Sequence, residues 1–262
     1  MNIQSLDVDV LMFRGEAYES IATAFIDGGD VLLVDVLGSV ADGQALRAHI
    51  EEVLGKRVRT VVLTHGFADH RAGLPLFADA AILAHPRCAE TLAQDKQLTA
   101  PELEALLARL KPVADGEALT FGRHELRFFH NEGKSRCSIG IEVPSSDLLF
   151  TGDNLLGQIA YISGATPELI HRGIDRLEAR PGAWLVEGHQ GVFPRASIAG
   201  VRHYMHALEQ RVREARRGGD IAAIRAEDCL AEGAVPTAFE REWHGNNLGL
   251  IASRGLFAEE AA

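Results

Sequence analysis

Cysteine and positive charge are both scarce in this chain of 262 residues, and each shortage excludes a class of protein. The three cysteines, Cys88, Cys137 and Cys229, form no close-spaced pair, so we predict no disulfide framework. Lysine and arginine total 26 against 37 aspartates and glutamates, which gives a formal net charge of -11. An acidic chain binds nucleic acids and anionic membranes poorly, so we expect neither as a partner.

Long apolar runs and targeting signals are missing as well. No run approaches the roughly 18–20 residues that a membrane-spanning helix needs. The first ten residues hold neither a basic nor an apolar stretch, so we expect no signal peptide and a cytoplasmic location. Repeats and Pro/Ser-rich linkers are also lacking, and apolar residues make up an ordinary 47%. We therefore predict one domain over residues 1–262.

Short β-branched or apolar runs alternate with helical periodicity along the chain. Strands are predicted at 8–14, 20–27, 30–36, 59–64, 81–84, 125–130, 138–143, 147–151 and 183–187. Helices are predicted at 41–54, 71–77, 86–93, 101–110, 167–179, 195–217 and 220–231. Two packed sheets flanked by helices and a doubly wound parallel sheet both fit this order. The mostly helical residues 194–262 are a candidate cap over a site built earlier in the chain.

Three metal-ligand side chains follow the β run at 61–63 within six residues: His65, Asp69 and His70. Imidazole and carboxylate are the ligands expected for zinc or iron at a catalytic site. The alternative is a helix start capped by Asp69, with two incidental histidines. Two later strands also end on such residues, Asp153 and His189. Each alone is typical of a turn or a structural histidine, but strand ends at one sheet edge converge.

Together these residues resemble the metallo-β-lactamase superfamily. His65, Asp69 and His70 match its His-x-His-x-Asp-His motif, while Thr-Gly-Asp153 and Gly-His189 match two later elements. The resemblance covers roughly residues 20–189. It implies an α/β (α+β) fold, a four-layer αββα sandwich of two mixed sheets flanked by helices, here with a helical C-terminal region. It also implies a hydrolase that uses a metal-bound water.

Two departures from the superfamily pattern imply a degenerate first metal site. Phe67 stands at the second motif histidine, and Lys134 stands where a downstream histidine ligand is expected. Of the first site's histidines only His65 remains. The ligands that the resemblance implies are His65, Asp69, His70, Asp153 and His189, and those of the second site are complete. We therefore predict one divalent ion, with zinc ahead of iron and manganese.

Lys134 has more than one interpretation. Its ammonium would replace part of the charge of the missing metal beside Asp153, or it would act as a base. A plain surface or salt-bridged lysine is the alternative. His130, four residues before Lys134, is a candidate substitute ligand, although a non-ligand histidine is common at this point of the superfamily.

Three functions remain open. The first is hydrolysis of a small ester, lactone or thioester, with Asp69 or Asp153 orienting the water and Lys134 stabilising the oxyanion. The second is a metal-dependent lyase, isomerase or oxygenase, and the third is a non-catalytic ligand-binding protein. The expected partner is a small-molecule substrate, and the helix at 195–217 is a candidate homodimer interface.

Overall fold

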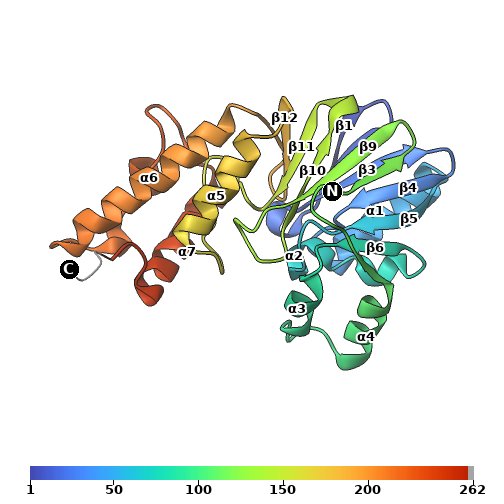
Figure 1. Ribbon diagram of the computed structural model, residues 1–262, viewed down its shortest axis with the longest axis horizontal. Coiled ribbons are helices and arrows are strands. Elements are labelled where there is room, and N and C mark those ends of the chain that lie inside the picture. Colours follow the sequence, from blue (N-terminus) through green and yellow to red (C-terminus); the bar gives the residue numbers. More distant parts are fainter. Residues whose placement is uncertain (259–262) are drawn as a thin grey trace.

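Two mixed β-sheets pack face to face in the molecule, which the computed structural model describes over residues 1–258, and the helices near the C-terminus extend from one side of them (Figure 1). The first sheet follows chain order: β1 (Asn2–Asp7), β2 (Val10–Arg14), β3 (Ile21–Asp27), β4 (Asp30–Val34), β5 (Arg57–Val62), β6 (Ala81–Ala84) and β7 (Leu110–Pro112). The second sheet has the order β13-β12-β11-β10-β9-β8. Its strands are β8 (Ala118–Phe121), β9 (His124–His130), β10 (Ile139–Val143), β11 (Leu148–Gly152), β12 (Trp184–Glu187) and β13 (Val192–Pro194).

Helices cover the outer side of each sheet. Beside the first sheet lie α1 (Val40–Ala48), which continues into a π-helical turn (His49–Val53), α2 (Ala68–Arg71), α3 (Cys88–Ala93) and α4 (Ala100–Arg109). Beside the second lie α5 (Pro167–Glu178), α6 (Ser197–Arg216) and α7 (Ala238–Arg254). Short 3₁₀ turns occur at Ala17–Glu19, Leu74–Phe77, Pro144–Ser146, Ile221–Ala223 and Ala226–Asp228.

Strand β4 shows why this chain forms layers. Leu32 and Val34 point into the core between the sheets, whereas Val31 and Leu33 point into the core under the helices. Both faces of the strand are buried, which explains its unbroken apolar run. The αββα sandwich is thus confirmed, and the doubly wound single sheet is wrong, because the strands divide between two sheets.

The helices α5, α6 and α7 share a third core with the outer face of the second sheet (Figure 1). Tyr204 is fully buried there, and its hydroxyl contacts His244 Nδ1 and Asn247 Nδ2, each at 3.0 Å. The single domain of residues 1–262 and the cap over 194–262 stay predictions, and residues 259–262 lie outside the described part. Within that part, no helix has the length and apolarity that a membrane crossing requires.

The predicted helix at 220–231 is wrong. Only two short 3₁₀ turns form there, because side chains compete with a helix for the backbone groups. Asp220 accepts from Ala222 N at 2.9 Å, and Asp228 accepts from Arg225 N at 3.3 Å. No helix range was predicted over α7, whose pattern is interrupted by two glycines. The short strands β1, β7, β8 and β13 were also missed.

Backbone hydrogen bonds from the first residues of β3 and β10 to loops of the opposite sheet join the two sheets at one edge. Ile21 N donates to Gly188 O at 2.9 Å, and Ile139 N donates to Thr64 O at 2.8 Å. In the first sheet Val34 pairs with Val62 in parallel register, so the residues after β4 and β5 leave the sheet at the same edge. The parallel strands β11 and β12 likewise end together in the second sheet. Strand ends of both sheets therefore meet here.

Candidate metal centre

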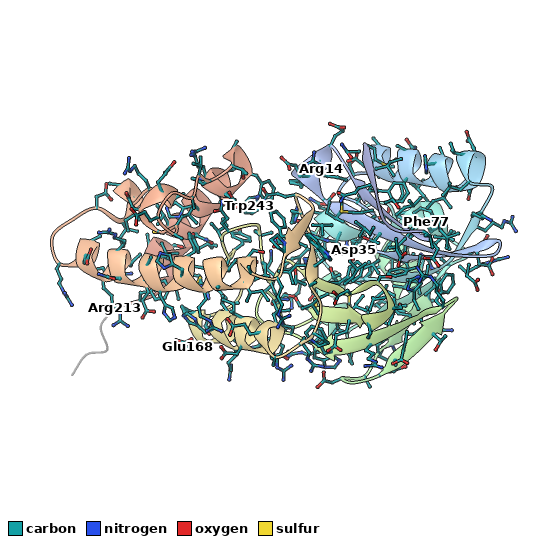
Figure 2. All side chains as sticks on the ribbon, turned by 90° about the horizontal axis from the view of Figure 1, so that it is seen from above. Arg14, Asp35, Phe77, Glu168, Arg213 and Trp243 are labelled. Atoms are coloured by element: carbon teal, nitrogen blue, oxygen red, sulfur yellow. The ribbon has the colours of Figure 1, made fainter. Side chains whose placement is uncertain are left out.

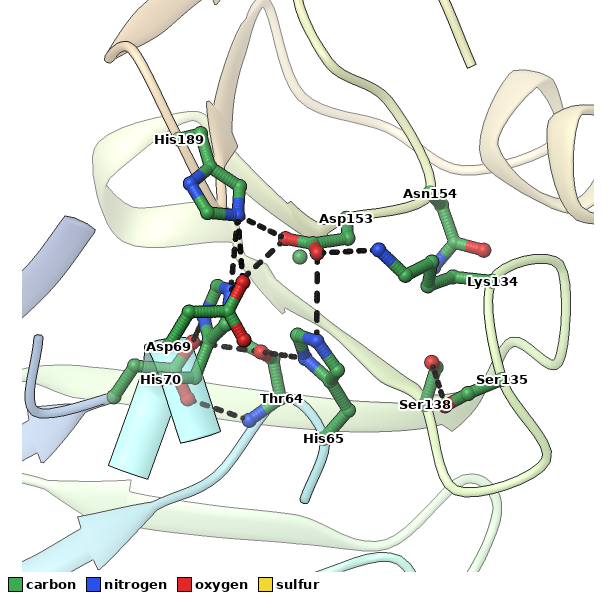
Figure 3. Close-up of polar contacts among 12 residues, drawn as sticks. Thr64, His65, Asp69, His70, Lys134, Ser135, Ser138, Asp153, Asn154 and His189 are labelled. Atoms are coloured by element: carbon green, nitrogen blue, oxygen red, sulfur yellow. Dashed lines mark hydrogen bonds and ion pairs between the residues drawn. The ribbon is translucent and has the colours of Figure 1, made fainter. Parts of the chain in front are cut away.

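Four side chains from these strand ends converge on one point (Figure 3). Asp69 and His70 come from α2, just after β5, while Asp153 and His189 follow β11 and β12. One ligand atom from each lies within 4.8 Å of the others. We call these four residues the metal centre. The loops after β11 and β12 also approach closely, since a Cβ at Gly188 would lie 2.1 Å from Asp153 Oδ1.

Asp153 Oδ1 lies in the middle of the metal centre. It is 3.1 Å from His70 Nε2 and 3.3 Å from His189 Nε2, and the two Nε2 atoms are 3.2 Å apart. Asp69 Oδ2 lies 3.4 Å from His189 Nε2. Asp69 is the one member that is not fully buried, with 22% of its side chain exposed against 1% for Asp153. The centre is therefore reached past Asp69.

Hydrogen bonds on the far side of each imidazole fix its orientation. His70 Nδ1 donates to Asp35 Oδ2 at 2.9 Å, and His189 Nδ1 donates to the carbonyl oxygen of Tyr18 at 2.7 Å. With a proton on each Nδ1, both Nε2 atoms present lone pairs to the centre. The partners were missed from the sequence. Asp35 follows β4 at the same sheet edge, a signal that was available, but a backbone carbonyl such as that of Tyr18 leaves no sequence signal.

A divalent cation fits this arrangement. Asp153 Oδ1 is buried and has no hydrogen-bond donor among the described residues. It faces the two imidazole Nε2 atoms, and because both Nδ1 atoms are engaged elsewhere, this buried cluster is stable only with a positive charge at its centre, either protons on the Nε2 atoms or a metal ion. Two imidazoles and two carboxylates form a donor set that suits zinc, iron or manganese. Of the predicted metal ligands, the centre therefore brings together Asp69, His70, Asp153 and His189.

Electrostatics also favour a cation at the metal centre. Burial opposes the charged form of both imidazoles, but the neighbouring carboxylates, Asp153 foremost, together raise the pKa of His70 and of His189. Burial likewise opposes ionisation of Asp153, yet the Lys134 ammonium and the neighbouring histidines hold the pKa of Asp153 well below its usual range. Protons and a metal ion therefore compete for the same two Nε2 atoms.

Lys134 and His65 lie on the other oxygen of the central carboxylate. Lys134 Nζ donates to Asp153 Oδ2 at 2.7 Å, and His65 Nε2 lies 3.4 Å from the same oxygen (Figure 3). Among the described residues, the buried His65 Nε2 has no hydrogen-bond partner, and His65 lies outside the four-residue group. Lys134 is only 4% exposed and forms an ion pair with Asp153, so the surface lysine is wrong and the salt-bridged lysine matches the geometry.

Two alternatives raised by the sequence do not match the geometry. His130 Nε2 bonds to the carbonyl oxygen of Val113 at 3.0 Å, and its ring packs on His85 with centroids 4.0 Å apart, so His130 does not replace the missing ligand. Asp69 does not cap a helix, because Phe67 occupies the N-cap position of α2 and makes no side-chain cap bond.

The sequence model of the metallo-β-lactamase superfamily matches residues 19–189, about two thirds of the chain, and this span contains the whole metal centre. The chain belongs to the metallo-β-lactamase superfamily. A hydroxyacylglutathione hydrolase of Cereibacter sphaeroides is 27% identical over 173 residues, which are 65% of this chain and 62% of the relative. The chain thus matches less than two thirds of that relative's length.

Solved structures agree on the fold of this superfamily member. A metallo-β-lactamase from Pontibacter korlensis is 14% identical with a TM-score of 0.64, and the match covers 76% of this chain and 95% of the other. One from Erythrobacter litoralis is 20% identical with a TM-score of 0.57, covering 76% and 92%. At such low identity the likeness is one of fold.

A second group of metal-type side chains lies on the helices of this superfamily member. His171 on α5 and His206 and Glu209 on α6 also offer atoms within 4.8 Å of one another. Glu209 pairs with Arg213 at 2.6 Å, and His206 is exposed. This group must be controlled for whenever bound metal is counted.

The Asp35→Asn variant is expected to bind its metal about tenfold to a hundredfold more weakly, because His70 loses the carboxylate that orients its ring. A competition titration against a chelator of known affinity measures this. Asp30→Asn, at the exposed start of the same strand, is the matched control and should keep native affinity. Equal affinities in both variants would show that Asp35 does not support the centre.

Proposed function

We propose that this chain is a metal-dependent hydrolase of small thioesters, esters or lactones, with one divalent ion held by Asp69, His70, Asp153 and His189. The observation that carries the proposal is the convergence of two imidazole Nε2 atoms on the buried Asp153 Oδ1, at 3.1 and 3.3 Å. Membership of the superfamily supports hydrolysis. The Cereibacter relative is named a hydroxyacylglutathione hydrolase, so thioesters are the first substrate type to test.

Asp69 is the proton acceptor in this proposal. A divalent ion at the centre supplies Lewis acidity, which makes water a better nucleophile and polarises the substrate carbonyl. Asp69 is the carboxylate of the centre that solvent reaches. Burial opposes its ionisation, but His70 and His189 outweigh burial and lower the pKa of Asp69, so it stays a carboxylate near neutral pH. Its Oδ2 is thus able to orient an attacking water and accept its proton.

Lys134 takes the electrostatic place of the first metal. Its ammonium lies 2.7 Å from Asp153 Oδ2, on the side where the superfamily pattern has the missing histidine ligand. There it keeps Asp153 ionised and holds that carboxylate in place. Its remaining N–H groups are donors for the oxyanion that develops on the substrate carbonyl. Asp153 therefore positions both the ion and the lysine.

Hydrolysis in heavy-oxygen water tests the proposal against the lyase, isomerase and oxygenase alternatives. We expect the zinc-loaded protein to cleave the acetyl thioester of N-acetylcysteamine and to place one solvent oxygen in the acetate. Removing the metal with a chelator should stop turnover, and adding zinc back should restore it. The proposal fails if a set of thioesters, esters and lactones is left uncleaved by metal-loaded protein, or if the product lacks solvent oxygen.

A further inference from the structure

A series of ring contacts, linked at one point by Lys134, runs from one side of the metal centre to the other. We call Phe67, Tyr161, Phe239 and Trp243 the aromatic collar. Its rings come from α2's N-cap, from the segment between β11 and α5, and from α7. These segments are far apart in the sequence, so only the fold assembles them.

The series begins at one imidazole of the centre and crosses α7. The Phe239 ring lies 5.3 Å from the His189 ring and 5.8 Å from the Trp243 ring. Trp243 in turn makes an edge contact with Tyr161, with centroids 4.5 Å apart. These spacings are typical of aromatic pairs in direct contact.

The second half of the series returns to the centre through Lys134. Its Nζ lies 4.6 Å from the centroid of Tyr161 and 5.6 Å from that of Phe67. Phe67 then meets His65 edge-on, with centroids 5.0 Å apart. The collar therefore runs from His189 round to His65, and it encloses the lysine that binds Asp153.

Hydrogen bonds anchor the collar to the loops of the metal centre. The start of α7 has a capping box between Thr237 and Glu240. Glu240 Oε1 also accepts from Gln158 N at 2.7 Å, three residues before Tyr161, and Thr237 Oγ1 bonds Gln190 Oε1 at 3.2 Å, next to His189. Figure 2 shows Trp243 at the end of the helical region that faces the sandwich. These hydrogen bonds thus hold the aromatic collar in a fixed position relative to the metal centre.

The chemistry of the collar selects its ligand. All four rings are partly exposed, so they offer apolar surface beside the reactive point. Among the described residues, the cation found over these rings is Lys134, and its ammonium is hydrogen-bonded to Asp153. The rings themselves carry no charge, so an uncharged ring stacks on the collar without leaving a buried charge unpaired.

We propose that the aromatic collar binds an uncharged aromatic acyl group of the substrate, such as a phenylacetyl group, and that α7 thereby sets substrate specificity. The specificity part of this inference rests on the proposed function, whereas binding of the aromatic group does not depend on turnover. Phe239 and Trp243 lie outside the span of the superfamily match, so this preference belongs to the chain's own helical region.

Fluorescence tests binding without turnover. The chain has two tryptophans, and Trp184 is 50% exposed on β12, so a Trp184→Phe protein reports on Trp243 alone. In the zinc-loaded protein, phenylacetamide should change the Trp243 emission saturably, and acetamide should not. Adding Phe239→Ala should weaken phenylacetamide binding by about tenfold, the range of a lost aromatic contact. An emission that does not respond to phenylacetamide overturns the inference.

Kinetics separate this inference from the proposed function. The ratio of kcat/KM for phenylacetyl over acetyl thioester should fall by about tenfold in Trp243→Ala and in Tyr161→Ala. Trp184→Ala is the matched control and should keep the native ratio. Trp243→Phe retains a ring, so its ratio should lie between those of Trp243→Ala and the native protein. Melting curves identify any variant that fails to fold.

The outcomes distinguish the two claims. If phenylacetamide binds but neither thioester is cleaved, the proposed function fails and the aromatic binding site stands. If both thioesters are cleaved and the collar variants lower both rates equally, the specificity role is wrong and the proposed hydrolysis stands.

Discussion

Asp153→Asn is expected to lower kcat/KM for thioester hydrolysis by about a thousandfold, equivalent to about 4 kcal/mol, and to release most of the bound metal. Asp153 is the one residue of the site that contacts both imidazoles and Lys134. The substitution removes a negative ligand and leaves the Lys134 ammonium buried without its counter-charge. Elemental analysis and kcat/KM on the same preparation measure both effects.

The Asp153→Asn substitution should also lower the free energy of unfolding. Breaking a buried ion pair by removing one partner typically costs about 3–5 kcal/mol. Asp153→Asn combined with Lys134→Met removes both charges, so this double variant should recover part of the lost melting temperature without recovering activity. Asp30→Asn is the exposed control for both measurements. If Asp153→Asn keeps native metal content and activity, Asp153 is neither a required metal ligand nor required for catalysis.

The Phe67→His and Lys134→His double variant is expected to bind about two metal ions per chain, where the native chain binds about one. Two positions of the degenerate first metal site lie beside one atom, Asp153 Oδ2. His65 Nε2 lies 3.4 Å from it without a hydrogen-bond partner, and Lys134 Nζ lies 2.7 Å from it. The Phe67 ring is in contact with His65. Two imidazoles added at these positions would complete a three-histidine set.

Counting these ions requires controls for each position. The two single variants should stay near one ion, because each supplies only part of the set. His206→Ala in every background removes the separate group on α5 and α6 from the count. Two ions in the native chain would show that this protein is not mononuclear, and none would favour the non-catalytic binding role.

The sequence carried most of the information about the layers and the strand ends. Buried strands such as β4 and β11 show as apolar runs. Asp153 and His189, which follow β11 and β12, were found as ligand candidates because a chain leaving a parallel strand exposes its side chains at one edge. The helix predicted at 220–231 failed for a local reason, since Asp220 and Asp228 bond to the backbone instead. Such competition is invisible to periodicity.

For Asp35 and Tyr18, residue type alone does not predict that they orient the histidines of the metal centre. Asp35 sits at a strand end like the ligands, yet its function depends on lying 2.9 Å from His70, which the sheet register decides. The Tyr18 group that bonds His189 is a backbone carbonyl, which every residue type carries. The residue type at this position therefore gives no sign of the contact. Tyr18 adopts a positive φ of 59°, a conformation fixed by its surroundings.

The sequence by itself determined the superfamily and the candidate ligands, because these depend on short motifs, each with members that lie near one another in the chain. Hydrophobic patterning located the strands but fitted two layouts, and the sandwich followed from the resemblance to the superfamily. It also located both departures, Phe67 and Lys134. Only the tertiary structure decided that Lys134 is buried on Asp153 and that α7 brings Phe239 to His189. Contacts between segments far apart in the chain depend on how the layers pack, and side-chain packing leaves no periodic signal in the sequence.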